Sequence, residues 1–139
     1  MYQSDYILRL IEQMGTLLRR VLSALREHRP DEVLELTDGA LETALGMSSA
    51  AHGSLTGEAL VAVLGGGGNV DPGLALVVGE ALLRRGQAHT LLGQEPSARH
   101  ELERAEAVLL VATGEEAAGR ARELLGELAQ LRDGAGYDR

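Results

Sequence analysis

The sequence predicts an all-α fold, a two-lobed bundle of about six helices, and three observations support this. Leu and Ala supply most of the apolar residues, while Phe and Trp are absent and aromatic residues make up only 2% of the chain. Leu and Ala favour helices, whereas strands favour β-branched and aromatic side chains. Apolar residues recur at helical spacing, and small residues recur in the second half of the chain. A length of 139 residues predicts one domain.

The first predicted helix covers residues 5–28, with Ser4 or Asp5 as its N-cap. Its apolar stripe is wider than a helix that is buried on one side needs. We therefore expect two neighbours, one of them a second copy of the chain. The predicted dimer interface follows a coiled-coil spacing of four and three residues, and consists of Ile7, Ile11, Met14, Leu18, Val21 and Leu25.

Pro30 separates the first helix from a second over residues 31–45, because proline suits a first helical turn and not an interior. Residues 46–53 are small and polar and are expected to form a loop. A short helix is predicted over 56–64, with Ser54 or Thr56 as its cap.

Four consecutive glycines, residues 65–68, predict a flexible joint between two lobes, 1–64 and 71–133, of a single domain over 1–133. After the joint at 65–70, Asp71 and Pro72 begin a helix that reaches about residue 92 and ends at Gly93. Another helix follows over 96–113. Gly114 ends it, a last helix begins at 115–116, and residues 134–139 are expected to be a frayed tail.

Small residues in the second half are spaced as in a pair of tightly packed antiparallel helices. Their spacing over about 79–112 resembles a single tetratricopeptide repeat. In that family the corresponding residues permit close approach within a helical hairpin. The resemblance implies that the hairpin packs through Gly86, Gly93, Ala98, Leu102 and Ala105, and small side chains let helix axes approach to about 8–10 Å.

The match departs from the family pattern at several positions. Arg85 stands where the family has an apolar residue, His89 and Glu95 stand where aromatic residues are common, and the closing proline is absent. Because the sequence contains no second repeat of comparable quality, the chain is not expected to form an array of repeats. Residues 5–14 also resemble the start of a family of small bacterial helical proteins, which implies a cytoplasmic bacterial protein.

Charge and composition exclude several classes of function. All 13 basic residues are Arg, and the net charge of −8 disfavours nucleic-acid binding. The absence of cysteine excludes disulfides, thiolate metal sites and a cysteine nucleophile. The longest apolar stretch, residues 74–83, is too short to span a membrane. The glycines at 65–68 match neither a dinucleotide-binding motif nor a phosphate loop, so no cofactor is expected.

Helix 31–45 is predicted to carry a continuous acidic stripe. A solvated face, a docking strip for arginines and a metal site are all compatible with it, although the Glu-x-x-His motif of di-metal bundles is absent. The stripe consists of Asp31, Glu35, Asp38 and Glu42, and the candidate partners, from the first helix or a second subunit, are Arg19, Arg20 and Arg26.

Histidines and serines give two further candidate sites. His89 and His100 lie on opposite arms of the predicted hairpin, where Glu101 or Glu103 would complete a metal or proton-transfer site. Surface or packing histidines are the simpler interpretation. A loop shared by serines and a histidine would suit a serine nucleophile, but no nucleophile-elbow motif accompanies it. These residues are Ser48, Ser49, Ser54 and His52.

The leading interpretation is a non-enzymatic scaffold that binds a protein partner, most simply a second copy of itself. The alternative is a helical bundle that binds a small ligand or metal through His89, His100 and nearby Glu side chains. A peptide-binding groove on the second lobe, with Arg85 and His89 as contacts, is a third interpretation.

Overall fold

The computed structural model describes residues 2–112 and 117–135. Within these ranges it contains seven helices and no strand, which confirms the predicted all-α bundle. The helices are α1 (Tyr2–Arg26), α2 (Pro30–Leu45), α3 (Ser49–Gly53), α4 (Gly57–Gly65), α5 (Pro72–Leu91), α6 (Glu95–Leu110) and α7 (Ala118–Ala135).

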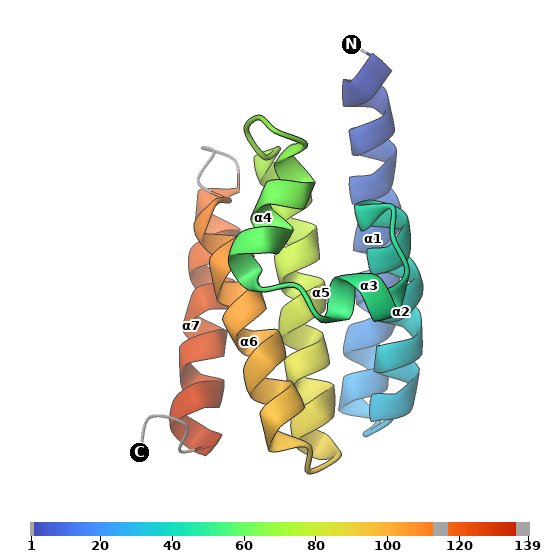
Figure 1. Cartoon of the computed structure of the whole chain (residues 1–139). Coiled ribbons are helices and arrows are strands. Elements are labelled where there is room, and N and C mark those ends of the chain that lie inside the picture. The colour runs from blue at the N-terminus through green and yellow to red at the C-terminus, as the bar shows by residue number, and fades with distance from the viewer. Residues whose placement is uncertain (1, 113–116, 136–139) are drawn as a thin grey trace.

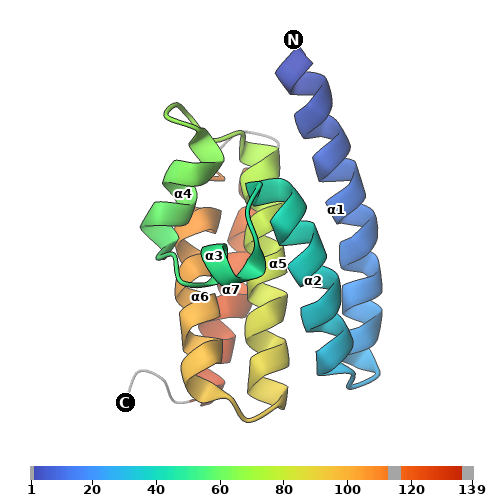
Figure 2. The same ribbon diagram turned by 45° about the vertical axis from the view of Figure 1, so that its right-hand side comes forward.

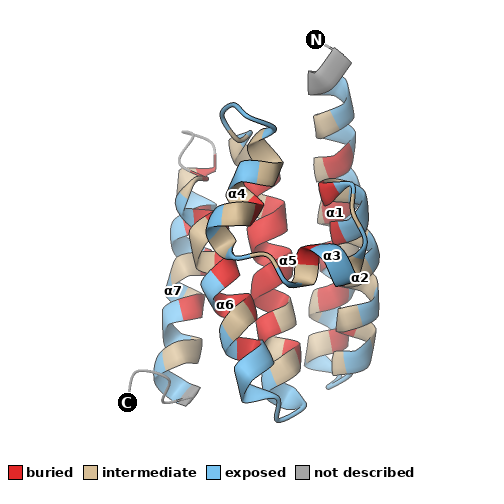
Figure 3. Cartoon of the chain, viewed as in Figure 1, coloured by how far each residue is buried: buried red, intermediate tan, exposed pale blue. Residues whose placement is uncertain are grey.

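Helix α5 lies at the centre of the bundle. It separates the α1–α2 pair from the α6–α7 pair, while α3 and α4 cross one face (Figure 1). A view turned by 45° places α2 between α1 and α5, and α4 beside α6 (Figure 2). Most residues of α5 are buried (Figure 3). Helix α5 is apolar over most of its circumference, and a helix of this kind needs neighbours on every side.

One core joins the two predicted lobes. Leu10, Met14 and Leu18 of α1 belong to the same cluster of buried side chains as Leu82 of α5 and Leu109 of α6. Both halves of the chain therefore pack on α5 and share its apolar surface.

Capping side chains set two helix boundaries as predicted. The predicted cap of the first helix is wrong, because α1 already begins at Tyr2 and both Ser4 and Asp5 lie within it. Asp71 Oδ1 accepts a hydrogen bond from the Leu74 amide at 3.1 Å at the start of α5. Of the two candidate caps for α4, Thr56 has this role, since its Oγ1 accepts from the Ala59 amide at 3.1 Å.

The predicted loop over 46–53 is wrong in part, because residues 49–53 form the short helix α3. Ser48 is its N-cap, and its Oγ accepts from the Ala51 amide at 3.2 Å. At the other end of the chain, Gly134 and Ala135 belong to α7 and not to a tail. The boundary predictions at 114–116 and the remainder of the predicted tail, 136–139, lie outside the described residues.

Helices α5 and α6 interlock through glycines on α5 and leucines on α6. A Cβ added to Gly86 would lie 2.6 Å from Leu102 Cδ2, and one added to Gly79 would lie 2.6 Å from Leu109 Cδ2. The Gly79–Leu109 contact lies two helical turns from the Gly86–Leu102 contact along both helices. Each glycine therefore makes room for a leucine of the facing helix.

The other hairpin residues have different roles. Ala98 and Ala105 of α6 are fully buried. Gly93 is exposed, and a Cβ there would meet no atom within 4 Å. Its φ of +73° places it in the left-handed region that favours glycine. Gly93 therefore serves the turn between α5 and α6 and makes no close contact between them.

Half of the predicted dimer interface is buried inside the chain. Met14, Leu18 and Val21 are 3%, 4% and 0% exposed, and they offer no surface to a second copy. The wide apolar stripe of α1 has two neighbours, as expected, but both belong to the same chain, because α1 packs on α2 and α5. Ile7, Ile11 and Leu25 are partly buried.

Substitution of Gly86 by alanine tests the interlocking contact. We expect Gly86→Ala to lower the free energy of unfolding by about 1–3 kcal/mol, because Leu102 is itself buried and has little room to move. Gly126→Ala in α7 is the matched control, since a Cβ there would meet no atom within 4 Å. This variant should have a free energy of unfolding about 0.5–1 kcal/mol higher than the wild type, because alanine favours a helix more than glycine does. Urea unfolding of both variants measures the difference, and equal stability of the two would contradict the contact.

Candidate functional site

A polar cavity of about 180 Å³ lies among α2, α3, α5 and α6. The side chains around it come from distant parts of the sequence and include most of the buried polar groups of this region. Helix α2 contributes Asp38, α3 contributes Ser49 and His52, α5 contributes Arg85 and His89, and α6 contributes Ser97, His100, Glu101 and Arg104.

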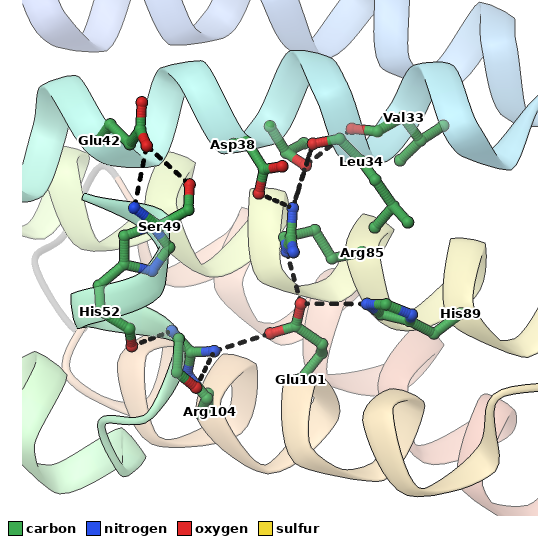
Figure 4. A network of polar contacts seen from close by, with 12 residues as sticks. Val33, Leu34, Asp38, Glu42, Ser49, His52, Arg85, His89, Glu101 and Arg104 are labelled. Carbon is green, nitrogen blue, oxygen red and sulfur yellow. Dashed lines mark hydrogen bonds and ion pairs between the residues drawn. The ribbon is translucent and has the colours of Figure 1, made fainter.

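The carboxylate of Glu101 is the centre of this network (Figure 4). Its side chain is only 4% exposed and lies among three basic groups. Arg85 donates through Nε to Oε2, and Arg104 donates through Nη1 to Oε1 at 2.9 Å. His89 Nε2 lies 3.6 Å from Oε2, which is an ion-pair distance.

The network shifts the pKa values of its members in opposite directions. Burial alone would raise the pKa of Glu101, but His89, Arg85 and Arg104 outweigh that effect and lower it. The pKa of His89 is raised, chiefly by the Glu101 carboxylate and against the effect of its own burial. Gln94 adds to this rise, since its Oε1 lies 2.7 Å from His89 Nδ1.

Arg85 connects this carboxylate to α2. Its Nη1 donates to the Leu34 carbonyl at 3.2 Å, to Thr37 Oγ1 at 3.0 Å and to Asp38 Oδ1 at 2.7 Å. One guanidinium therefore binds α2, α5 and α6 together, at the position where the tetratricopeptide pattern has an apolar residue.

The acidic stripe of α2 is used in part by the fold. Asp38 pairs with Arg85, and Glu42 accepts hydrogen bonds at 2.9 Å from both the amide and the hydroxyl of Ser49. Asp31 and Glu35 are exposed. The candidate partners of this stripe were Arg19, Arg20 and Arg26. Within the described residues, the arginine that pairs with the stripe is Arg85 of α5.

Helix α3 is held against α6 through its carbonyl groups. Arg104 Nη2 donates to the His52 carbonyl at 3.0 Å, and His100 Nε2 lies 2.8 Å from the Gly53 carbonyl oxygen. The last carbonyls of a helix have no partner within it, so these two side chains complete the end of α3.

The imidazole of His52 is buried without a hydrogen-bond partner. His52 is 2% exposed, and neither ring nitrogen makes a hydrogen bond within the described part of the chain. Burial is the main cause that lowers its pKa, and the charges of Arg104 and Arg85 lower it further. The ring is therefore neutral at pH 7, with one donor and one acceptor nitrogen.

The two histidines of the predicted hairpin site both line the cavity but serve different partners. His89 pairs with Glu101, one of the two glutamates expected near the histidines. His100 instead contacts the Gly53 carbonyl. Across residues 2–112 and 117–135, no group of three histidine or acidic side chains is arranged to hold a metal ion.

The serines near His52 have structural roles. Ser48 caps α3, Ser49 donates to Glu42, and Ser54 donates to the Ala51 carbonyl at 3.2 Å. None of these hydroxyls reaches the His52 ring, because the ring nitrogens make no hydrogen bond to any described residue. A serine–histidine pair is therefore not formed here.

Two arginines of the buried polar core were not predicted from the sequence. Arg104 was not singled out, and Arg84 forms a second network, in which its Nη2 lies 3.1 Å from Glu80 and 3.2 Å from Glu127. Arg120 joins this network through Glu80 at 3.2 Å. Charged residues in the mostly apolar α5 were the available signal for the second network, and they do not bear on Arg104, which lies on α6.

Comparisons with protein-family models, curated proteins and solved structures find no match for this chain. The tetratricopeptide likeness therefore rests on residue spacing. No helix among the described residues has both the length and the hydropathy to cross a bilayer.

Removal of the central carboxylate should destabilise the fold strongly. We expect Glu101→Gln to lower the free energy of unfolding by about 3 kcal/mol or more, because it leaves Arg85 and Arg104 buried without their shared counter-charge. Glu103→Gln, on an exposed position of the same helix, is the matched control and should change stability by less than about 0.5 kcal/mol. Guanidinium unfolding at pH 7 compares them, and a loss of equal size in both variants would refute the central role of Glu101.

The raised pKa of His89 predicts a pH dependence of stability. The folded chain holds this proton more tightly than the unfolded chain, so its contribution is complete below pH 6.5 and is lost as the pH rises through the folded-state pKa. We expect the stability difference between the wild type and His89→Gln to shrink from pH 6 to pH 8.5. Urea unfolding at constant ionic strength measures it, and a difference that grows with pH would contradict the ion pair.

Proposed function

We propose that this chain is a non-enzymatic protein-interaction module that associates with a second copy of itself through the first half of α1. The first turns of α1 extend beyond the neighbouring helices (Figure 1). Tyr6 and Leu8, on these turns, are 57% and 56% exposed. Exposed apolar side chains that gather in one place are typical of an interaction surface.

A wide groove lies beside these two residues. Its volume is about 790 Å³, and it runs between α1 and the segment that joins α4 to α5. Leu10 of α1, Leu64 of α4 and Val70 of the connecting segment contribute apolar walls. Exposed apolar side chains on a projecting helix, next to a groove with partly apolar walls, favour self-association, because each copy supplies both surfaces.

A two-fold interface would use the same patch of α1 on both subunits. Asp5 and Arg9 are exposed one helical turn apart, on the side of α1 opposite Ile7. Neither lines the groove, so both charges stay outside the proposed contact.

The other members of the predicted interface limit where this contact lies. Met14, Leu18 and Val21 are covered by α2 and α5 and are left out of the proposal. Ile7, Ile11 and Leu25 are partly exposed. Leu25 lies near the other end of α1, so Ile7 and Ile11 remain in the proposed contact. The proposed setting is the cytoplasm, in line with the resemblance of residues 5–14 to small bacterial helical proteins.

Sedimentation of surface variants tests the proposal. We expect the wild type to be a dimer at tens of micromolar, and the double variant Tyr6→Ser, Leu8→Ser to be a monomer with unchanged helix content. Leu110→Ser is the matched control, because Leu110 is 58% exposed on α6 and does not line the groove; this variant should remain a dimer. A monomeric wild type at that concentration would rule out the interface.

A further inference from the structure

We propose that the polar cavity among α2, α3, α5 and α6 binds a small oxyanion, a carboxylate or a phosphate, through His52, Arg85 and Arg104. This inference does not depend on self-association through α1. The two sites use different residues and lie on different parts of the molecule.

The first argument is unused hydrogen-bonding capacity on residues that line the cavity. Both ring nitrogens of His52 and Nε of Arg104 are buried and have no partner within the described residues. The hydrogen bonds of Arg85 to described residues leave from Nε and Nη1, and none leaves from Nη2. Buried polar groups that stay unpaired cost free energy, so in native proteins they are usually met by water or a ligand.

The type of the unused groups points to an acceptor ligand. Arginine nitrogens only donate, and neutral His52 offers one further N–H. Guanidinium groups match carboxylate and phosphate oxygens in geometry and charge. A metal cation would be repelled by Arg85 and Arg104, and no group of three histidine or acidic side chains in the described ranges is arranged to hold one.

The charge of the cavity also suits an anion. Glu101 and Asp38 balance the two guanidiniums, and protonated His89 adds a positive charge beside Glu101. With His89 protonated, these five side chains carry a formal charge of +1, in a chain with a net charge of −8. Because Glu101 is shared among three basic groups, its repulsion of an incoming anion is largely offset.

The size of the cavity suits a small ligand. Its volume of about 180 Å³ is below the roughly 300–1,000 Å³ of pockets that hold drug-sized ligands. An acetate or a phosphate ion fits this space. The site is also open enough to be reached, because Arg85 retains 14% of its side-chain exposure.

Anion binding should tighten as the pH falls from 8 to 6. The charged and titratable groups that face the site are Asp38 from α2, His52 from α3, Arg85 and His89 from α5, and His100, Glu101 and Arg104 from α6. Of these, His89 gains a proton over the range, with its pKa raised by Glu101. Acetate is the probe for this measurement, since its own charge does not change between pH 6 and 8.

Thermal unfolding with two probe ions tests the inference. We expect either sodium phosphate or sodium acetate to raise the Tm saturably against sodium chloride of equal ionic strength, by about 5 °C at ten times the Kd. His52→Leu should weaken binding at least ten-fold, while His28→Asn should bind like the wild type. His28 is exposed at the turn after α1 with a φ of +56°, a conformation that asparagine tolerates.

Imidazole NMR of the wild type supplies a second readout that needs no variant. Saturable movement of the His52 resonances with phosphate alone or acetate alone supports the inference and identifies which oxyanion the site prefers. Absence of saturable binding by both ions up to about 50 mM, far above the working range of a specific site, overturns it. Equal binding by His52→Leu and the wild type overturns it as well.

Discussion

The close approach of α5 and α6 is the constraint on which the rest of the structure depends. Gly79 and Gly86 leave space on α5 that Leu109 and Leu102 of α6 fill. This contact fixes both the separation and the register of the two helices. Because of that register, Arg85 and His89 on α5 lie next to Glu101 on α6. A packing feature made of apolar atoms thus determines where the charges meet.

The buried charges then orient the peripheral elements. Arg85 extends from Glu101 to α2, and Arg104 extends from the same carboxylate to the carbonyl groups of α3. Buried ion pairs add little net stability, because desolvation offsets their attraction. Here their hydrogen bonds link α2 to α5 and α3 to α6 in the observed orientation. The cavity lies between the elements held in this way.

Local signals in the sequence predicted the helices well. Asp71 with Pro72, and Thr56, begin helices because a capping side chain acts on amides a few residues away. The small residues of the hairpin were also readable, since an antiparallel pair joined by a short turn has a register set by that turn. Helix α3 was missed because five residues are too few to show an apolar period.

Features that depend on distant partners could not be read in the same way. The stripe on α1 predicted two neighbours, but the residues did not reveal that both come from the same chain. Arg85 could be identified as an exception to an apolar pattern, whereas its contacts with Leu34 and Asp38 join residues 51 and 47 positions apart in the sequence. The sequence placed His52 beside serines but did not reveal that its ring is buried, because α3 contacts Arg104 and His100 from about fifty positions away.

The paired fit of glycine and leucine has a consequence for how this protein can change over evolutionary time. Leu102 fills the space that Gly86 leaves, so a larger residue on α5 is accommodated only if the facing residue on α6 becomes smaller. Gly79 and Leu109 are linked by the same requirement. Among homologues these positions should therefore covary in pairs, with each loss of volume on one helix matched by a gain on the other.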